Sequence, residues 1–217
     1  MERAIGIPAY AALRDQIRAD VIAGKLPAGM RLTIADLVKR YGVSQMPVRE
    51  ALQALEGEGV ITILPHRGAR VLSLDAPRVR NVYDIRAAIE GLLIRLSVPN
   101  LTHGAMVQLA AIQQQFREAA QKRKVETLFA LNWEFHNLIY RHAGNPEALE
   151  IFDRYASLLG TLRRQYGYDA VRTAQMVKEH EQILAALRKP DEEQLEKLAR
   201  RHCEGAKKDL LARMTSP

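Results

Sequence analysis

A single change of periodicity near residue 60 constrains the fold of this chain more than any other sequence feature. Before it, apolar residues recur at helical spacing over about 9–23, 34–41 and 45–56. After it, β-branched residues over 60–64 and 69–73 predict two strands, joined by the turn Pro65-His66-Arg67-Gly68. Three helices followed by a hairpin is the order of a winged helix-turn-helix, which we therefore expect over residues 1–75.

No further strand signal follows Asp75. Helical spacing instead predicts six helices, over about 76–97, 103–122, 125–142, 145–164, 171–188 and 191–213. Breaks at Pro99-Asn100, Gly144-Asn145-Pro146 and Lys189-Pro190-Asp191 separate several of them. The predicted fold class is therefore mainly α, with an N-terminal winged helix-turn-helix and a C-terminal all-helical bundle over residues 76–217.

Composition narrows the class of protein only a little. No apolar run approaches the roughly 20 residues that a membrane span needs, and the lone Cys203 excludes a disulfide within the chain. Both features lead us to expect a cytoplasmic protein without membrane association. The net charge of +7 is spread along the chain, with ten Lys and Arg against eight Asp and Glu in residues 1–75. Local placement of the basic residues therefore decides whether nucleic acid is a partner.

The third predicted helix has the features of a helix that reads DNA. Ser44 is placed to cap it, and Pro47 falls in the first turn, where its missing N–H is not needed. A recognition helix enters the major groove with its N-terminal residues. Gln45 is long enough to reach base edges, and Arg49, one turn later, can reach a phosphate or a guanine.

The predicted hairpin adds a second DNA contact. Its tip carries Arg67 and Gly68, a cation on a tight turn that fits a minor groove. A single arginine on a helix is usually a solvated surface residue. The order of turn, cap, helix, strand, basic tip and strand is far more specific, and it predicts DNA binding.

This region resembles the DNA-binding domain of GntR-family bacterial regulators. The shared pattern is a Leu-Pro-x-Gly turn, then Gly-Val-Ser-x-x-Pro-Val-Arg-Glu-Ala-Leu, a Gly-Val strand and an Arg-Gly wing. The resemblance implies a transcription repressor. Because a single recognition helix reads too few base pairs for useful specificity, we also expect a homodimer on a palindromic operator. The resemblance also implies that seven residues approach double-stranded DNA: Arg31, Ser44, Gln45, Pro47, Arg49, Arg67 and Gly68.

Three histidines fall on apolar faces of the predicted C-terminal helices: His136, His180 and His202. Asn132 lies one turn before His136 and points the same way. If these faces meet in one core, three imidazoles and an amide converge there, and neutral imidazole is a preferred ligand of zinc and nickel. The alternative is that each histidine is a hydrogen-bonded core residue.

The C-terminal half resembles the FCD domain of the FadR subfamily, in its shorter VanR-like form. The resemblance rests on residues 83–90, on Asn132-x-x-Phe135-His136, on Gly144-Asn145-Pro146 and on Glu179-His180-x-x-Ile183-Leu184. Many members bind a metal through one Asp and three His. The resemblance therefore implies a divalent metal, zinc or nickel, held by His136, His180 and His202, with Asn132 at the Asp position.

Arg86 is the candidate effector-binding residue. It lies on or beside the apolar face of the first helix of the bundle, so its guanidinium needs an anion. Two partners remain open at this stage: Glu90, one helical turn away, and the carboxylate of a small organic acid, the usual kind of effector in this family. Cys203 is expected to serve packing, and Trp133 to lie at a rim or an interface.

Three functions are compatible with the sequence. The first is a transcription regulator whose operator binding is controlled by a small carboxylate effector beside a metal. The second is a regulator whose sensor has lost its metal and serves dimerisation only, an alternative that Asn132 keeps open. The third is a metal-dependent enzyme, which an open position beside three histidines permits, although no His-Glu-x-x-His motif occurs.

Overall fold

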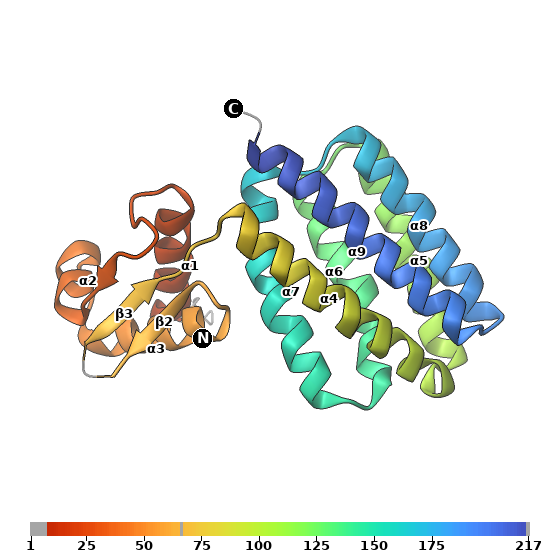
Figure 1. Cartoon of the computed structure of the whole chain (residues 1–217), viewed down its shortest axis with the longest axis horizontal. Coiled ribbons are helices and arrows are strands. Elements are labelled where there is room, and N and C mark those ends of the chain that lie inside the picture. The colour runs from red at the N-terminus through yellow and green to blue at the C-terminus, as the bar shows by residue number, and fades with distance from the viewer. Residues whose placement is uncertain (1–7, 66, 216–217) are drawn as a thin grey trace, which may run out of the picture. The chain divides into compact units, whose positions relative to one another are not determined.

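The computed structural model describes residues 8–65 and 67–215. These residues divide into two compact units, one ending at Asp75 and one beginning at Ala76 (Figure 1). His66, which the sequence places at the tip of the wing, lies outside the described residues. None of the helices in the described ranges is both long and apolar enough to span a bilayer.

Unit 1 is the predicted winged helix-turn-helix. Its helices are α1 (Ala9–Ile22), α2 (Ile34–Tyr41) and α3 (Gln45–Gly57), and its strands are β1 (Arg31–Leu32), β2 (Ile61–Leu64) and β3 (Gly68–Val71). The antiparallel sheet has the order β1-β3-β2, with Leu32 opposite Ala69 and Ile63 opposite Ala69 on the other side. Strand β1 was not predicted, because two residues are too few to show an alternating pattern.

The ends of the helices in unit 1 follow local capping chemistry, with one exception. The Thr33 hydroxyl accepts a hydrogen bond from the Asp36 amide at the start of α2, and Gly42 ends that helix with φ 67°. Ser44 occupies the N-cap position of α3, but its side chain makes no capping hydrogen bond. The expectation that the Ser44 side chain caps α3 is therefore wrong. Since Ser44 is exposed, water or a phosphate oxygen can serve the first amides of α3 instead.

Gly68 is required at the start of β3. Its φ is +83°, and a Cβ built on it would lie 2.1 Å from the carbonyl oxygen of Leu32 in β1. We expect Gly68→Ala to lower the free energy of unfolding of unit 1 by about 2–3 kcal/mol, through backbone strain and displacement of β1. Chemical denaturation measures this. Gly57→Ala is the control, because a Cβ there has no atom within 4 Å; an equal loss in both variants would contradict the prediction.

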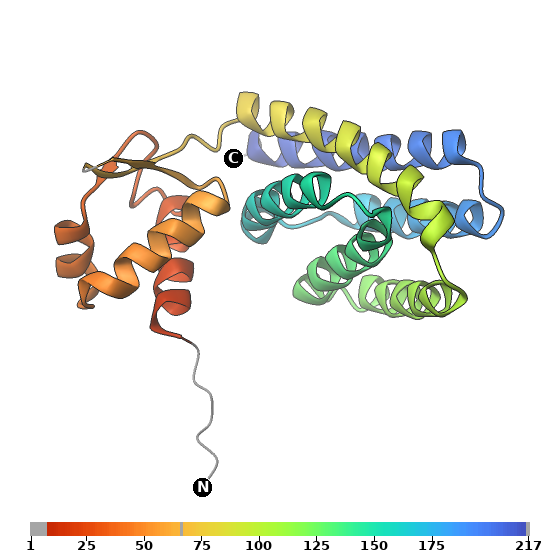
Figure 2. The ribbon, with the colours of Figure 1, turned by 90° about the horizontal axis from the view of Figure 1, so that it is seen from below.

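Unit 2 contains the predicted helices in the predicted order. Its α-helices are α4 (Ala76–Ser97), α5 (His103–Gln121), α6 (Val125–Tyr140), α7 (Pro146–Tyr166), α8 (Ala170–Arg188) and α9 (Glu192–Thr215). Short 3-10 turns follow α4 (Val98–Asn100) and α6 (Arg141–Ala143). Helices α4 and α9 run side by side on one face of the unit, and α5 lies on the opposite face (Figure 2).

The core of unit 2 is built mainly from leucine, alanine, isoleucine and aromatic side chains. Phe116, Phe135, Ile139, Phe152 and Ile183 are all at most 1% exposed. They come from α5, α6, α7 and α8, and α4 and α9 add further leucines, so the core lies where all six helices meet. The three candidate histidines project into this same region, which makes any polar group there dependent on partners within the protein.

Candidate metal centre and DNA-reading surface

His136, His180 and His202 converge in the core of unit 2, as the helical spacing predicted. They come from α6, α8 and α9, all three are buried, and their ligand atoms lie within 4.8 Å of one another. The Nε2 atoms of His136 and His202 are 3.1 Å apart. Residues separated by up to 66 positions in the chain are thus brought to one point.

The outer ring nitrogens of His180 and His202 face fixed acceptors. His180 Nδ1 lies 3.1 Å from Gln113 Oε1. The Gln113 amide nitrogen donates to the Val177 carbonyl at 3.0 Å, so it is the oxygen that faces the imidazole. His202 Nδ1 lies 2.7 Å from Glu179 Oε2, and a carboxylate only accepts. Both imidazoles therefore carry their hydrogen on Nδ1, and their Nε2 lone pairs point inward.

His136 is oriented in the same way through a relay. Its Nδ1 lies 3.3 Å from the Tyr140 hydroxyl, and that hydroxyl donates its hydrogen to Glu90 Oε2 at 2.9 Å. Burial, followed by the charge of Glu90, raises the pKa of Tyr140 well above its usual value, so it keeps this hydrogen. Its oxygen can only accept from His136 Nδ1. The Nε2 atom of His136 therefore also carries a lone pair and no hydrogen.

Two buried acceptors are without partners. They are His180 Nε2 in the cluster and Oδ1 of Asn132, which lies one helical turn before His136; neither has a hydrogen-bond partner among the described residues. Two lone-pair nitrogens facing each other, as in His136 and His202, repel unless a proton or a cation lies between them. Adjacent nitrogen ligands of an ion with bonds near 2.1 Å lie about 3 Å apart. The residues present therefore fit a divalent metal bound to imidazole and amide groups.

Burial keeps two of these imidazoles neutral. It lowers the pKa of His136 and of His180 well below 6.5, and His202 and Arg172 lower both further. The Phe135 ring stacks on His180, with centroids 4.3 Å apart and planes 10° apart. Neutral, rigidly held imidazoles are the form that ligates metals.

Arg86 is paired with Glu90 in this structure. Its Nε and Nη2 lie 2.6 and 2.5 Å from Glu90 Oε1, and Glu90 is fully buried. Burial opposes the charged form, but Glu90 more than compensates and raises the pKa of Arg86. Of the two partners that the sequence left open for Arg86, the structure therefore contains Glu90. Contact with an effector carboxylate stays a proposal.

Sequence reasoning missed the residues that orient the histidines: Gln113, Tyr140, Glu179 and the partner of Glu179, Arg172. Arg172 Nη1 lies 3.0 Å from Glu179, and its Nη2 donates to the His202 carbonyl at 3.1 Å. Burial opposes ionisation of Glu179, yet hydrogen bonds from His202 and Arg172 hold its pKa below the usual value. The only signal in the sequence was the position of Glu179 beside His180.

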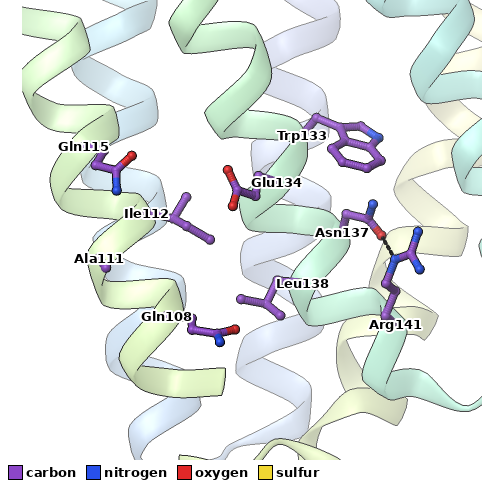
Figure 3. Close-up of a pocket in the computed structure, with 9 residues that line it drawn as sticks. All are labelled: Gln108, Ala111, Ile112, Gln115, Trp133, Glu134, Asn137, Leu138 and Arg141. Carbon is purple, nitrogen blue, oxygen red and sulfur yellow. Dashed lines mark hydrogen bonds between the residues drawn. The ribbon is translucent and has the colours of Figure 1, made fainter. Parts of the chain in front are cut away.

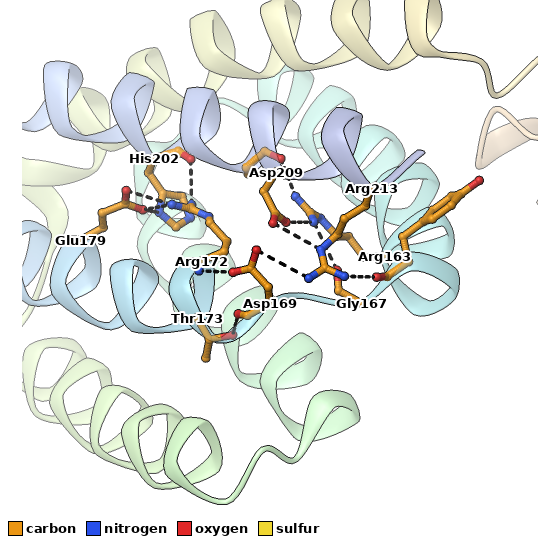
Figure 4. A network of polar contacts seen from close by, with 11 residues as sticks. Arg163, Gly167, Asp169, Arg172, Thr173, Glu179, His202, Asp209 and Arg213 are labelled. Carbon is orange, nitrogen blue, oxygen red and sulfur yellow. Dashed lines mark hydrogen bonds and ion pairs between the residues drawn. The ribbon is translucent and has the colours of Figure 1, made fainter. Parts of the chain in front are cut away.

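The same polar network continues towards the end of α9. Asp169 accepts from the Arg172 amide at 2.5 Å and lies 3.7 Å from the Arg213 guanidinium. Arg213 also contacts Asp209, which binds the buried guanidinium of Arg163 (Figure 4). These contacts tie the segment between α7 and α8 to α9, and so stabilise the positions of His180 and His202.

A separate groove of about 530 Å³ lies between α5 and α6 (Figure 3). Trp133, 47% exposed, is among the residues that line it. The groove is also lined by polar side chains, among them Glu134 and Asn137, which accepts from Arg141 at 2.7 Å. None of the predicted metal or effector residues lines it.

The predicted DNA-contacting residues of unit 1 lie on β1, at the start of α3 and on the hairpin. Gln45 and Arg49 are exposed on α3, and Pro47 is half-buried in its first turn. Arg31 Nε donates to the Arg67 carbonyl at 2.8 Å, so Arg31 supports the wing from β1. Arg67 is exposed in the turn before β3. The geometry is that of an exposed helix start beside a cationic hairpin.

Comparison with known proteins agrees with both units. The family described as "FCD domain" matches residues 81–205, and "Bacterial regulatory proteins, gntR family" matches residues 9–71. The HTH-type transcriptional repressor RspR of Escherichia coli (strain K12) is 29% identical over 187 residues, 86% of this chain and 82% of RspR. The HTH-type transcriptional regulator McbR of the same organism is 25% identical over 194 residues, 88% of this chain and 85% of McbR.

Among solved structures, E. coli McbR/YncC has the same fold, with a TM-score of 0.74 and 20% sequence identity over 97% of this chain and 100% of that one. The FCD match alone extends over more than half of the chain. The chain therefore belongs to the GntR family of bacterial regulatory proteins, with an FCD domain as its second unit.

Proposed function

We propose that this protein is a cytoplasmic transcription repressor that binds a palindromic operator as a homodimer. Similarity to the repressor RspR supports repression. One recognition helix reads few base pairs, so two helices related by a two-fold axis match a palindrome and supply specificity. Light scattering should give a dimer both free and on operator DNA; a monomer in both states would contradict the assembly.

The proposed sensor is a divalent metal site in unit 2, with zinc or nickel as its metal. The observation that supports this proposal is the convergence of His136, His180 and His202. Each Nδ1 has a hydrogen-bond partner, and each Nε2 faces the inside of the cluster. Asn132, with its unpartnered Oδ1, is the proposed fourth ligand. When bound, the ion supplies a Lewis-acidic position for an oxygen of a small carboxylate effector.

Arg86 is the proposed hydrogen-bond donor to that carboxylate. Its guanidinium is 14% exposed and already held by Glu90, and a planar guanidinium can serve more than one acceptor. Effector binding controls the operator only if the ligand binds the DNA-released state more tightly than the DNA-bound state. The polar network from Glu179 to Arg163 joins the site to α9, and we propose that it transmits this preference.

The metal-free sensor is the second candidate, favoured only by the amide at Asn132. It predicts the same operator binding with no metal in the purified protein. A metal-dependent enzyme has no support, because the relatives are transcription regulators.

Elemental analysis after incubation with zinc or nickel separates these candidates. We expect about one ion per wild-type chain, little or none in His180→Ala, and tighter retention in Asn132→Asp, because a carboxylate adds charge to a neutral ligand set. His142→Ala is the matched control, since His142 bonds the Leu138 carbonyl and lies outside the triad. A wild-type chain without metal would leave the histidines as core hydrogen-bonders.

A further inference from the structure

The buried charges around the histidine cluster cancel in pairs. Each buried arginine in this region has one carboxylate partner. The three pairs are Arg86 with Glu90, Arg172 with Glu179, and Arg163 with Asp209, and no side chain in them is more than 14% exposed. The three pairs of buried side chains around the histidine cluster therefore carry no net charge.

The proposed ligands do not change this balance. His136, His180 and His202 ligate only as neutral imidazoles, and Asn132 contributes an uncharged amide. A divalent cation held by these four groups adds two positive charges to a buried, otherwise neutral site. Uncompensated charge in a protein interior is strongly unfavourable, so an anion must supply the balance.

Two buried arginines of this network each carry an unused donor. Arg172 and Arg163 are both 3% exposed, and the Nε of each is buried without a hydrogen-bond partner in the described chain. Arg172 is one side chain from the cluster, since it binds Glu179 and the His202 carbonyl. The charges of Arg163, Arg86 and Arg172 all act on the hydroxyl of Tyr168, a half-buried side chain. Desolvation raises the pKa of this hydroxyl to about 12, although the three charges favour its ionised form.

We infer that the effector of this chain is a dianion, a small molecule carrying two negative charges on oxygen. One charged group would bind at the metal, and the second would accept from the unused arginine donors and Tyr168. A dicarboxylate and a phosphate monoester share this chemistry. The inference rests on the proposed metal site and deepens it by assigning the charge of the ligand.

The test compares ligands that match in size and differ in charge. Full-length protein loaded with nickel is titrated at pH 8 with succinate, butyrate, methyl phosphate and acetate, and affinity is measured by calorimetry and by the shift in Tm. Metal content is measured before and after, because dicarboxylates can also extract metal. We expect succinate or methyl phosphate to bind about tenfold or more tightly than the monoanions, as one additional charge at short range implies. Which of the two binds better distinguishes a dicarboxylate from a phosphate ester.

Asn132→Asp supplies the missing charge and should shift the preference towards butyrate or acetate. Asn137→Asp is the matched control, since it adds the same charge to the same helix beside Arg141 and outside the cluster. It should keep the wild-type preference. Nickel-loaded wild type that binds mono- and dianions within about threefold would overturn the inference and leave the metal site standing. Wild-type protein that takes up no nickel would instead overturn the proposed function of unit 2 as a metal-dependent sensor.

Discussion

Replacing Arg49 with alanine should lower operator affinity about 100-fold, or about 2.7 kcal/mol, without changing the stability of unit 1. Arg49 is exposed one turn into α3, next to buried Val48, so the helix surface at this position is fixed by the core. Exposed arginine substitutions rarely cost more than about 0.5 kcal/mol in stability. The measurement is a fluorescence anisotropy titration, at fixed salt, of an operator selected from random duplexes.

Two further variants calibrate this result. Arg188→Ala removes the same charge from an exposed position in unit 2 and should change affinity less than about threefold. Arg67→Ala removes the wing cation and should have an intermediate effect, because a wing contact adds to the contacts of the recognition helix. If Arg49→Ala binds as tightly as wild type, α3 is not the recognition helix.

Breaking the ion pair between Glu179 and Arg172 should lower the free energy of unfolding more than any other substitution proposed for this protein. Glu179→Ala leaves the guanidinium of Arg172 buried without its carboxylate, and it removes the acceptor of His202 Nδ1. Removing one partner of a buried pair costs about 3–5 kcal/mol. Chemical denaturation of metal-free protein measures this loss independently of metal binding.

Glu181→Ala is the matched control on the same helix. Glu181 pairs with Arg117 at 2.5 Å, but both side chains are 43% exposed, so solvent screens the pair and the loss should stay below about 1 kcal/mol. The double variant Glu179→Leu with Arg172→Met should recover much of the stability, since no charge is left buried alone. Equal losses in Glu179→Ala and Glu181→Ala would show that burial of the first pair has no energetic consequence.

Much of the fold could be predicted because its signals are short-range. The cap of α2 at Thr33, its end at Gly42 and the start of α7 after Asn145 depend on residues within one turn of each other. The errors concern short segments. Strand β1 is recognisable only through its pairing with β3, which lies far along the chain, and the Ser44 side chain makes no capping hydrogen bond.

The sequence by itself determined that three histidines lie on apolar helical faces and that Arg49 lies on the exposed face of its helix, because periodicity fixes which side of a helix is buried. Only the tertiary structure decided which nitrogen of each ring faces inward. The partners that fix this are distant in the chain: Gln113 lies 67 residues from His180, and Glu179 lies 23 residues from His202. The pairing of Arg163 in α7 with Asp209 in α9 was likewise decided by helix packing, since periodicity gives the direction of a side chain but not the neighbour it meets on another helix.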